Sequence, residues 1–395
     1  MSCIVERYFN LNRILLLLVG LWPYQKSKLA QFQLICFFSI LVTFIVFQLT
    51  TFMTLKCTIN NIIKILSDTF SILILVIKYN SFYINSNTVK YSMEQLQRIH
   101  DELKDSNEIA IIEKYGNDAK RYTTILTIML FRFFICSLSI AVSAQLWPDL
   151  MYVISFANKS RYHLYFSTEY FIDQERYFYL LLFHTNAAVC IGLIVLLATG
   201  TLLIAYFQHA CGMFKIASYR IENALEIYVS KINLKNEYLV YRSLIYAVHI
   251  HQKAMMFSEY VISRFEISFM LLIFFGVITM SLKIYQIFQI ISTTYNIEEL
   301  LLTFIGTLFC LLYMFLANLV GQNITDHCNL VSTTAYEVRW YITPPQIQKM
   351  ILFLLQRGTK TFGLNVGGLF IASLECFATL ANASLSYFTV MYSMQ

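Results

Sequence analysis

Apolar stretches of roughly 20 residues or more recur along this chain, and polar stretches separate them. An α-helix of that length crosses about 30 Å of hydrocarbon, because each residue adds about 1.5 Å. The pattern therefore predicts an all-α polytopic membrane protein with seven transmembrane helices. The predicted spans cover residues 30–53, 59–82, 123–146, 177–207, 265–290, 299–321 and 366–392.

Charged residues interrupt the second predicted span at Lys64, Asp68 and Lys78. A charged side chain inside a membrane is costly, and it is therefore a functional candidate by default. Lys64 and Asp68 are four residues apart, so they share one face of a helix. We expect these two residues to pair with each other, which favours a structural role over a functional one.

The polar segments 86–121 and 209–260 are too long for tight turns, yet both have helical patterning. In the second segment, Ile221, Ala224, Leu225 and Tyr228 recur at helical spacing. We expect spans four and five to continue as helices beyond the membrane. The amphipathic stretch 326–358 adds a further helix to this predicted layer.

The apolar run Ile14–Leu21 is too short to span a membrane, and Trp22-Pro23 follows it in place of a small-residue cleavage site. We interpret it as an interfacial or docking helix, with Trp22 at the depth of lipid headgroups.

Composition supports a membrane protein. The chain has 395 residues, of which 58% are hydrophobic and only 13% are charged, whereas a soluble domain has about 25% charged residues. Much of the surface must therefore face membrane lipid. The basic residues lie between apolar runs and form no patch, so we expect no nucleic-acid partner. The nine cysteines form no Cys-x-x-Cys pair, and we interpret them as packing residues.

Lysine and arginine are distributed unevenly between the two sides of the predicted membrane. Segments on the side of the N-terminus hold 20 of them, and segments on the opposite side hold 3. The positive-inside rule then predicts a cytosolic N-terminus and an extracellular C-terminus. Asn158-Lys159-Ser160 lies in the longest predicted outer loop, where Asn158 is a candidate glycosylation site.

We find no motif for catalysis, for a phosphate loop or for a metal site. His249 and His251 are two residues apart and so lie on different faces of a helix. The sequence therefore favours neither an enzyme nor a protein with a cofactor.

The last predicted span has one mixed face of small, hydroxyl and apolar side chains. A helix that faced only lipid would not need the hydroxyl groups. Two interpretations remain open, close helix packing and the lining of a pore with a narrow apolar gate. The face comprises Ala383, Ser386, Tyr387, Val390, Ser393 and Met394.

Several sequence elements resemble the insect odorant receptor family. Near the N-terminus, Gly20-Leu21-Trp22-Pro23 is similar to a family element. The C-terminal part is similar in Ser332–Tyr341, Arg357–Phe370, Ser373-Leu374-Glu375 and Ser386–Met391. The length, the number of spans and the predicted orientation also fit. That orientation is the reverse of a G-protein-coupled receptor.

The resemblance implies a subunit of a heterotetrameric, ligand-gated, non-selective cation channel. Such a channel lies in the plasma membrane of a sensory-neuron dendrite and senses small volatile apolar molecules. Residues 1–325 would hold the ligand pocket in spans one to six, and residues 326–395 would hold an amphipathic helix and the pore-lining span. By position, Val390 and Met394 match the apolar gate and Ser393 matches the polar filter position.

The resemblance also implies the role of the subunit. The shared coreceptor usually has Gln where this chain has Ser393, and its loop at 209–260 is longer than the one here. This chain therefore resembles a ligand-tuning subunit that pairs with the coreceptor. Candidate pocket residues, chosen by depth and helix face, are Phe70, Phe134, Ser137, Ala141, Phe183, His184, Thr279 and Tyr285.

Two alternatives remain at this point. A gustatory receptor-type channel of the same superfamily would end its last span in Thr-Tyr, five apolar residues and Gln-Phe. Here Ser386-Tyr387 is followed by Ser393-Met394, which favours the odorant branch. A secondary transporter would show inverted repeats and broken helices, and we see neither in the sequence.

Overall fold

The structure is a computed structural model that describes residues 7–25, 27–54, 58–155, 167–173, 176–230, 234–293 and 297–393. Asn158 and Met394 lie outside the described residues. The helices are α2 (Asn10–Leu18), α3 (Lys28–Leu49), α4 (Thr51–Thr54), α5 (Ile59–Ile84), α6 (Ser86–Glu102), α7 (Ser106–Ser155), α8 (Phe178–Ser230), α9 (Leu234–Thr293), α10 (Ile297–Glu337), the 3₁₀ helix η1 (Trp340–Ile342), α11 (Pro345–Gly358) and α12 (Leu374–Ser393). Two short antiparallel strands, β1 (Asn365–Val366) and β2 (Phe370–Ile371), precede α12.

The seven predicted spans correspond to α3, α5, α7, α8, α9, α10 and α12, so the all-α membrane fold is confirmed. Within the described residues, four helical stretches are long and apolar enough to cross a membrane. They are Lys28–Thr54, Phe178–Glu226, Glu237–Thr293 and Ile297–Glu337.

The start of the last predicted span was wrong. Residues 365–371 form a β-hairpin, and the helix begins only at Leu374. Gly367 and Gly368 have φ values of 66° and 69°, and the N–H of Leu369 donates to the carbonyl of Val366 at 3.3 Å. This two-residue turn with positive φ at both positions reverses the chain, which a continuous helix cannot do.

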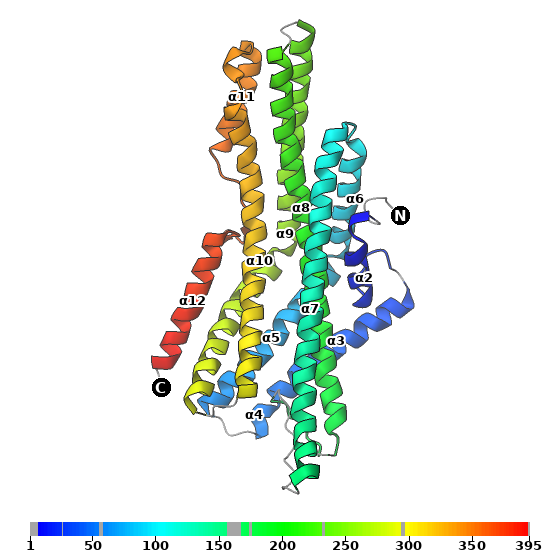
Figure 1. The fold of residues 1–395 in the computed structure, drawn as a ribbon, viewed down its shortest axis with the longest axis vertical. Helices are drawn as coiled ribbons and strands as arrows, with labels where there is room; N and C mark the ends of the chain where they lie inside the picture. Colours follow the sequence, from blue (N-terminus) through cyan, green and yellow to red (C-terminus); the bar gives the residue numbers. More distant parts are fainter. Residues whose placement is uncertain are drawn as a thin grey trace.

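Four helices run far beyond the thickness of a membrane. Helices α7, α8, α9 and α10 contain 50, 53, 60 and 41 residues, whereas a span needs only about 20. The prediction that spans four and five continue as helices is therefore confirmed. The long helices give the molecule two ends (Figure 1). We call them the α11 end, with α6, α11 and the C-terminus of α8, and the α4 end, with α4 and the N-termini of α5 and α10.

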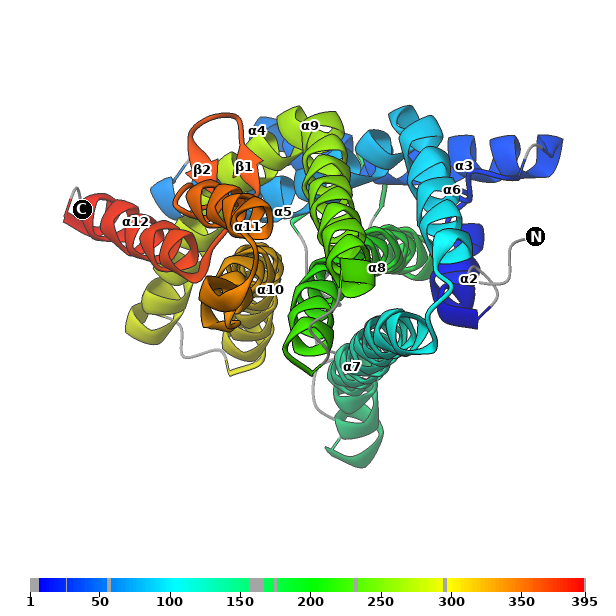
Figure 2. The same ribbon diagram turned by 90° about the horizontal axis from the view of Figure 1, so that it is seen from above.

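The main core lies around α8 and extends from the α11 end into the predicted spans. Viewed along the bundle in Figure 2, α8 lies between α7, α9, α10 and α2. Ala210, Met213, Phe214 and Ala217 of α8 are fully buried. A Cβ on Gly212 would lie 3.1 Å from Ile112 Cδ1, so small residues on α8 let neighbouring helices approach closely.

Helix α2 docks on α8, which decides between the two interpretations of the run at 14–21. The Asn12 amide donates to Thr201 Oγ1 at 3.0 Å, and Leu16 and Val19 are buried. Trp22 is also buried, so it packs inside the protein and does not lie at a membrane surface.

An ion pair fastens three helices at the α11 end. Arg220 of α8 donates from Nε and Nη2 to the Glu108 carboxylate of α7 at 2.5 and 2.8 Å. Its Nη1 donates to the carbonyl of Tyr246 on α9 at 2.9 Å. This paired geometry satisfies two charges that are both largely removed from solvent.

Candidate functional site

Helix α12 packs against α9 and α10 through one narrow face (Figure 1). Leu380, Ser384 and Phe388 are its buried residues. The Phe388 ring lies 4.8 Å from the ring of Phe288 on α9, measured between centroids. Residues at a spacing of four form this face, so it is a regular helical stripe.

Most of the mixed face predicted from the sequence is left uncovered by α12, although Ala383 packs in the cluster around Leu380. Tyr387 and Val390 are 59% and 56% exposed, and Ser386 and Ser393 are exposed too. The Ser393 hydroxyl donates to the carbonyl of Val390 at 2.9 Å. Because the serines bond their own helix, this face can lie beside lipid, water or another helix without an unsatisfied donor.

Three of the predicted pocket residues lie where α5 meets α9. The Phe70 ring is 5.4 Å from that of Phe275, and the Tyr285 hydroxyl donates to Asn60 Oδ1 at 3.3 Å. Thr279 is 2% exposed, and its hydroxyl has no hydrogen-bond partner among the described residues. A buried hydroxyl of this kind is available to a polar group of a ligand.

These residues of α5 and α9 contact α12, the helix that carries the candidate gate residue Val390. Phe70 and Tyr285 belong to one apolar cluster with Phe388, on the packed face of α12. A molecule that displaced these side chains would therefore press on α12.

A polar cavity of about 160 Å³ opens at the α4 end between α5, α9 and α10. Lys64 was expected to pair with Asp68, and the two side chains interact electrostatically. The ion pair that Lys64 forms is with Glu299 of α10, which was not predicted. The two residues are 235 positions apart, so no local pattern could reveal the pair. The cavity is lined by Asn60, Asn61, Lys64, Asp68, Gln286, Gln289, Ile290, Thr293, Glu299 and Thr303.

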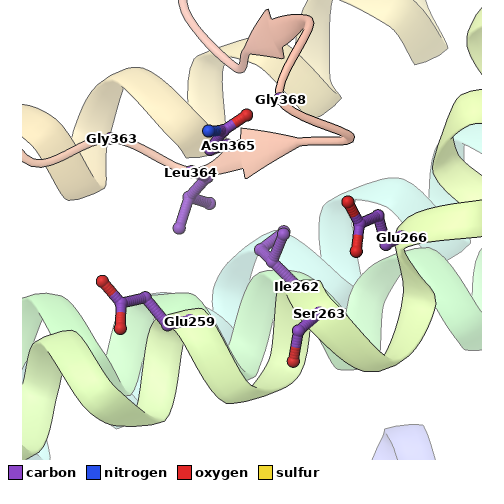
Figure 3. A pocket seen from close by; sticks show the side chains of 8 residues that line it. All are labelled: Glu259, Ile262, Ser263, Glu266, Gly363, Leu364, Asn365 and Gly368. Carbon is purple, nitrogen blue, oxygen red and sulfur yellow. The ribbon is translucent and has the colours of Figure 1, made fainter.

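A second cavity of about 290 Å³ separates α9 from the β-hairpin. Figure 3 shows Glu259, Ser263 and Glu266 on the α9 side, opposite the hairpin strand that carries Asn365. Close packing surrounds the cavity, because a Cβ on Gly367 would lie 2.6 Å from Met270 Sδ. Gly367 is therefore tightly packed against α9, whereas open space surrounds Gly368.

Comparison with known proteins places the chain in a family. The family model described as "7tm Odorant receptor" matches residues 58–385. The chain belongs to the insect odorant receptor family. Two solved structures of the insect olfactory receptor OR5 from Machilis hrabei, one in complex with eugenol, match with a TM-score of 0.73 at 16% identity. Each alignment covers 99% of this chain and 98% or 99% of the other.

Members of this family are membrane-embedded, ligand-gated channel receptors and are not enzymes. The match decides for the odorant branch over the gustatory alternative, because the model that fits is that of the odorant receptors. Olfaction and ion conduction are thus the processes in which the receptor acts.

The other pocket candidates of the receptor lie elsewhere. His184 bonds Thr43 at 3.1 Å and Tyr170 at 2.8 Å through its two ring nitrogens, so it packs between α8, α3 and the segment 167–173. Phe183 beside it is 74% exposed. Neither residue joins the group at α5 and α9. Phe134, Ser137 and Ala141 fall on α7, and their side chains lie outside the described part of the structure.

The sequence marked Lys78 as a charged residue within a span, but it did not predict the partners of Lys78. Lys78 of α5 is 2% exposed, and its ammonium group lies 5.8, 5.3 and 5.7 Å from the ring centroids of Phe82, Phe269 and Tyr313. Aromatic faces attract a cation, so the three rings stabilise the charge between α5, α9 and α10. The i, i+4 spacing of Lys78 and Phe82 was the local signal for this arrangement.

Proposed function

We propose that this receptor is the ligand-tuning subunit of a heterotetrameric, non-selective cation channel that it forms with the odorant coreceptor. The main support for this proposal is the uncovered face of α12. One helix cannot enclose a pore, so several subunits must each contribute their last helix to a central path. Val390 and Met394 form the apolar gate in this arrangement, and Ser393 supplies the adjacent polar position.

In this proposal the ligand is a small volatile molecule of low polarity, which binds where α5 meets α9. Phe70 and Tyr285 provide apolar area, and Thr279 provides one polar contact. Binding favours the state in which the last helices separate, because the ligand displaces side chains that touch Phe388. The gate then widens and fills with water, and cations pass.

Exposed aromatic side chains at the α11 end support assembly with partner subunits. Three aromatic side chains here are largely exposed, although they lie on parts of α10, η1 and α11 outside the predicted spans. They are Tyr336 (70% exposed), Tyr341 (64%) and Phe353 (70%). Apolar groups gathered outside the lipid mark a protein contact. In the proposed orientation this end lies in the cytosol at the plasma membrane of a sensory dendrite, and Asn158 faces the outside.

The first experiment expresses the receptor in cells with and without an insect odorant coreceptor. Currents are recorded against a volatile panel that includes eugenol. An odorant-evoked cation current that requires both chains supports the proposal. A receptor that never associates with the coreceptor, yet moves solutes alone, contradicts it and favours a transporter.

The pore face is tested by cysteine accessibility in the same cells. We expect a charged, membrane-impermeant thiol reagent to reduce the current of Val390→Cys several-fold and to leave Leu385→Cys at the level of the unmodified receptor. Leu385 is 48% exposed but lies on another face of α12. Equal modification of both variants would place the pore elsewhere.

A further inference from the structure

Four charged side chains of opposite sign meet at the α4 end. Lys64 of α5 pairs with Glu299 of α10, with side chains 35% and 26% exposed. Asp68 lies one turn along α5 and interacts electrostatically with Lys283 of α9 and with Lys64. Lys283 in turn extends to α10, where its Nζ lies 3.5 Å from the Cβ position at Gly306. Two basic and two acidic side chains from three helices thus lie near one another.

The ion pair between Lys64 and Glu299 constrains how α5 and α10 can move. A charge is costly at membrane depth unless a partner compensates it. Separation of α5 from α10 would leave both Lys64 and Glu299 without that compensation. The helices therefore either keep this contact or exchange it for another complete one, and intermediate positions are disfavoured.

The charged group is linked to α12 through one short segment of α9. On one side of that segment, the Ser67 hydroxyl of α5 donates to Gln286 Oε1 at 3.3 Å, close to the bond between Tyr285 and Asn60. On its other side, Leu282 and Tyr285 pack with Phe388 of α12. A shift of α5 or α10 at this end therefore reaches the packed face of α12 through two turns of α9.

We propose that Lys64, Asp68, Lys283 and Glu299 form an interhelical latch that sets how readily the gate on α12 opens. Lys64 and Glu299 are its positioning residues, because their pair alone joins α5 directly to α10 within the latch. The latch rests on the proposed channel function. Its four side chains come from α5, α9 and α10, and none of them lies on α12.

The test is a charge exchange in the full receptor, expressed with the coreceptor. The cation current without ligand is measured for Lys64→Glu, Glu299→Lys and the double variant, and is divided by the receptor labelled at the cell surface. We expect each single reversal to change the normalised current by about fivefold, the effect of a coupling of roughly 1 kcal/mol. The double variant restores the pair with opposite polarity and returns the current to within about twofold of the unmodified receptor.

The matched control exchanges an exposed pair that lies outside the latch. Lys90 and Glu94 of α6 are 3.9 Å apart, with side chains 44% and 41% exposed. Their reversal, singly or together, leaves the normalised current unchanged. Lys64→Met and Glu299→Gln replace the reversals if those variants do not reach the surface, and they shift the current in the same direction by a smaller factor.

Single variants that conduct like the unmodified receptor at equal surface amounts would overturn the latch. So would a double variant that differs from the unmodified receptor as much as either single one. The absence of current from the unmodified receptor with the coreceptor, in every condition, would instead overturn the channel function on which the latch rests.

Discussion

The two ends of the receptor are packed in different ways. At the α11 end, Ala210, Met213, Phe214 and Ala217 of α8 are fully buried, whereas only 11% of the most apolar stretch of α10 is buried. The main core gathers residues of α2, α8 and α11 together, while α12 is held by small clusters around Leu380 and Phe388. One end has the packing of a soluble protein, and the other leaves its apolar surface to lipid.

This difference has a physical origin. Outside the membrane, burial of apolar area drives the helices together. Inside it, lipid is as apolar as leucine, so association depends on close fit, hydrogen bonds and paired charges. The α11 end is therefore suited to hold subunits in place, and the membrane half is suited to small rearrangements. Changes at the α11 end, at the joint before α12 and in the membrane half test this difference.

The largest expected effect is at the α11 end. Arg220→Ala leaves the Glu108 carboxylate, with a side chain only 8% exposed, without its partner. Removal of one member of a buried pair costs about 3 kcal/mol. Thermal unfolding of the detergent-solubilised receptor should show a marked fall in melting temperature.

Arg242→Ala is the control for this change. Arg242 is exposed and, among the described residues, bonds the hydroxyl of Tyr246 at 3.1 and 3.3 Å. We expect its melting temperature to match that of the unmodified receptor. An equal fall in melting temperature in the two variants would mean that the ion pair of Arg220 and Glu108 does not stabilise this end.

The next largest effect is expected where α10 contacts the segment that leads into α12. A Cβ on Gly321 of α10 would lie 2.3 Å from the carbonyl oxygen of Ala372, so Gly321→Ala must displace the residues that lead into α12. Overpacking of this kind costs roughly 1–3 kcal/mol, and we expect the current per surface receptor to fall several-fold. Gly276→Ala serves as the control, because open space surrounds that position. A normal current from Gly321→Ala would show that the residues before α12 can move without an effect on the channel.

Acid should weaken the α11 end selectively. His251 lies 14 residues before the predicted span at 265–290 and contacts Cys328 Sγ at 3.5 Å and the ring of Phe214. Burial, together with the nearby charge of Arg357, lowers the pKa of His251 to about 4. The unfolded chain binds a proton near pH 6.5 and the folded one does not, so stability is lost as pH falls from about 6.5 towards 4.

The expected loss from His251 between pH 7 and 5.5 is about 1 kcal/mol. Melting temperatures of the solubilised receptor measured across this range check it. His251→Gln should flatten the dependence, and His249→Gln, which changes an exposed histidine, should not. An unchanged slope in His251→Gln would mean that another group causes the acid sensitivity.

The smallest effect is expected in the membrane half. Thr279→Val replaces a buried hydroxyl that has no partner among the described residues with a methyl group of similar shape. We expect the stability to stay equal or to rise by up to about 1 kcal/mol. If an odorant bonds this hydroxyl, the concentration needed for half-maximal current rises at the same time. A clear loss of stability would show that the hydroxyl already has a partner.

Much of this receptor follows from its sequence alone. Seven apolar stretches predicted the spans, because the length of a helix that crosses lipid depends on local composition only. The spacing of Ser386, Tyr387, Val390 and Ser393 predicted the mixed face of α12, because helical periodicity is also local. Residues near both termini carried the resemblance to the family, which the match over 58–385 confirmed.

The tertiary structure alone decided which distant residues meet. It paired Lys64 with Glu299, surrounded Lys78 with three rings, and separated His184 from Thr279 and Tyr285. It also showed the start of α12 after a β-hairpin, which packs against Met270 of α9 at Gly367. Periodicity tells which face a residue occupies, but the partner of that face depends on how helices far apart in the chain pack. For that reason the sequence predicted the helices and the family, and only the fold could show the latch.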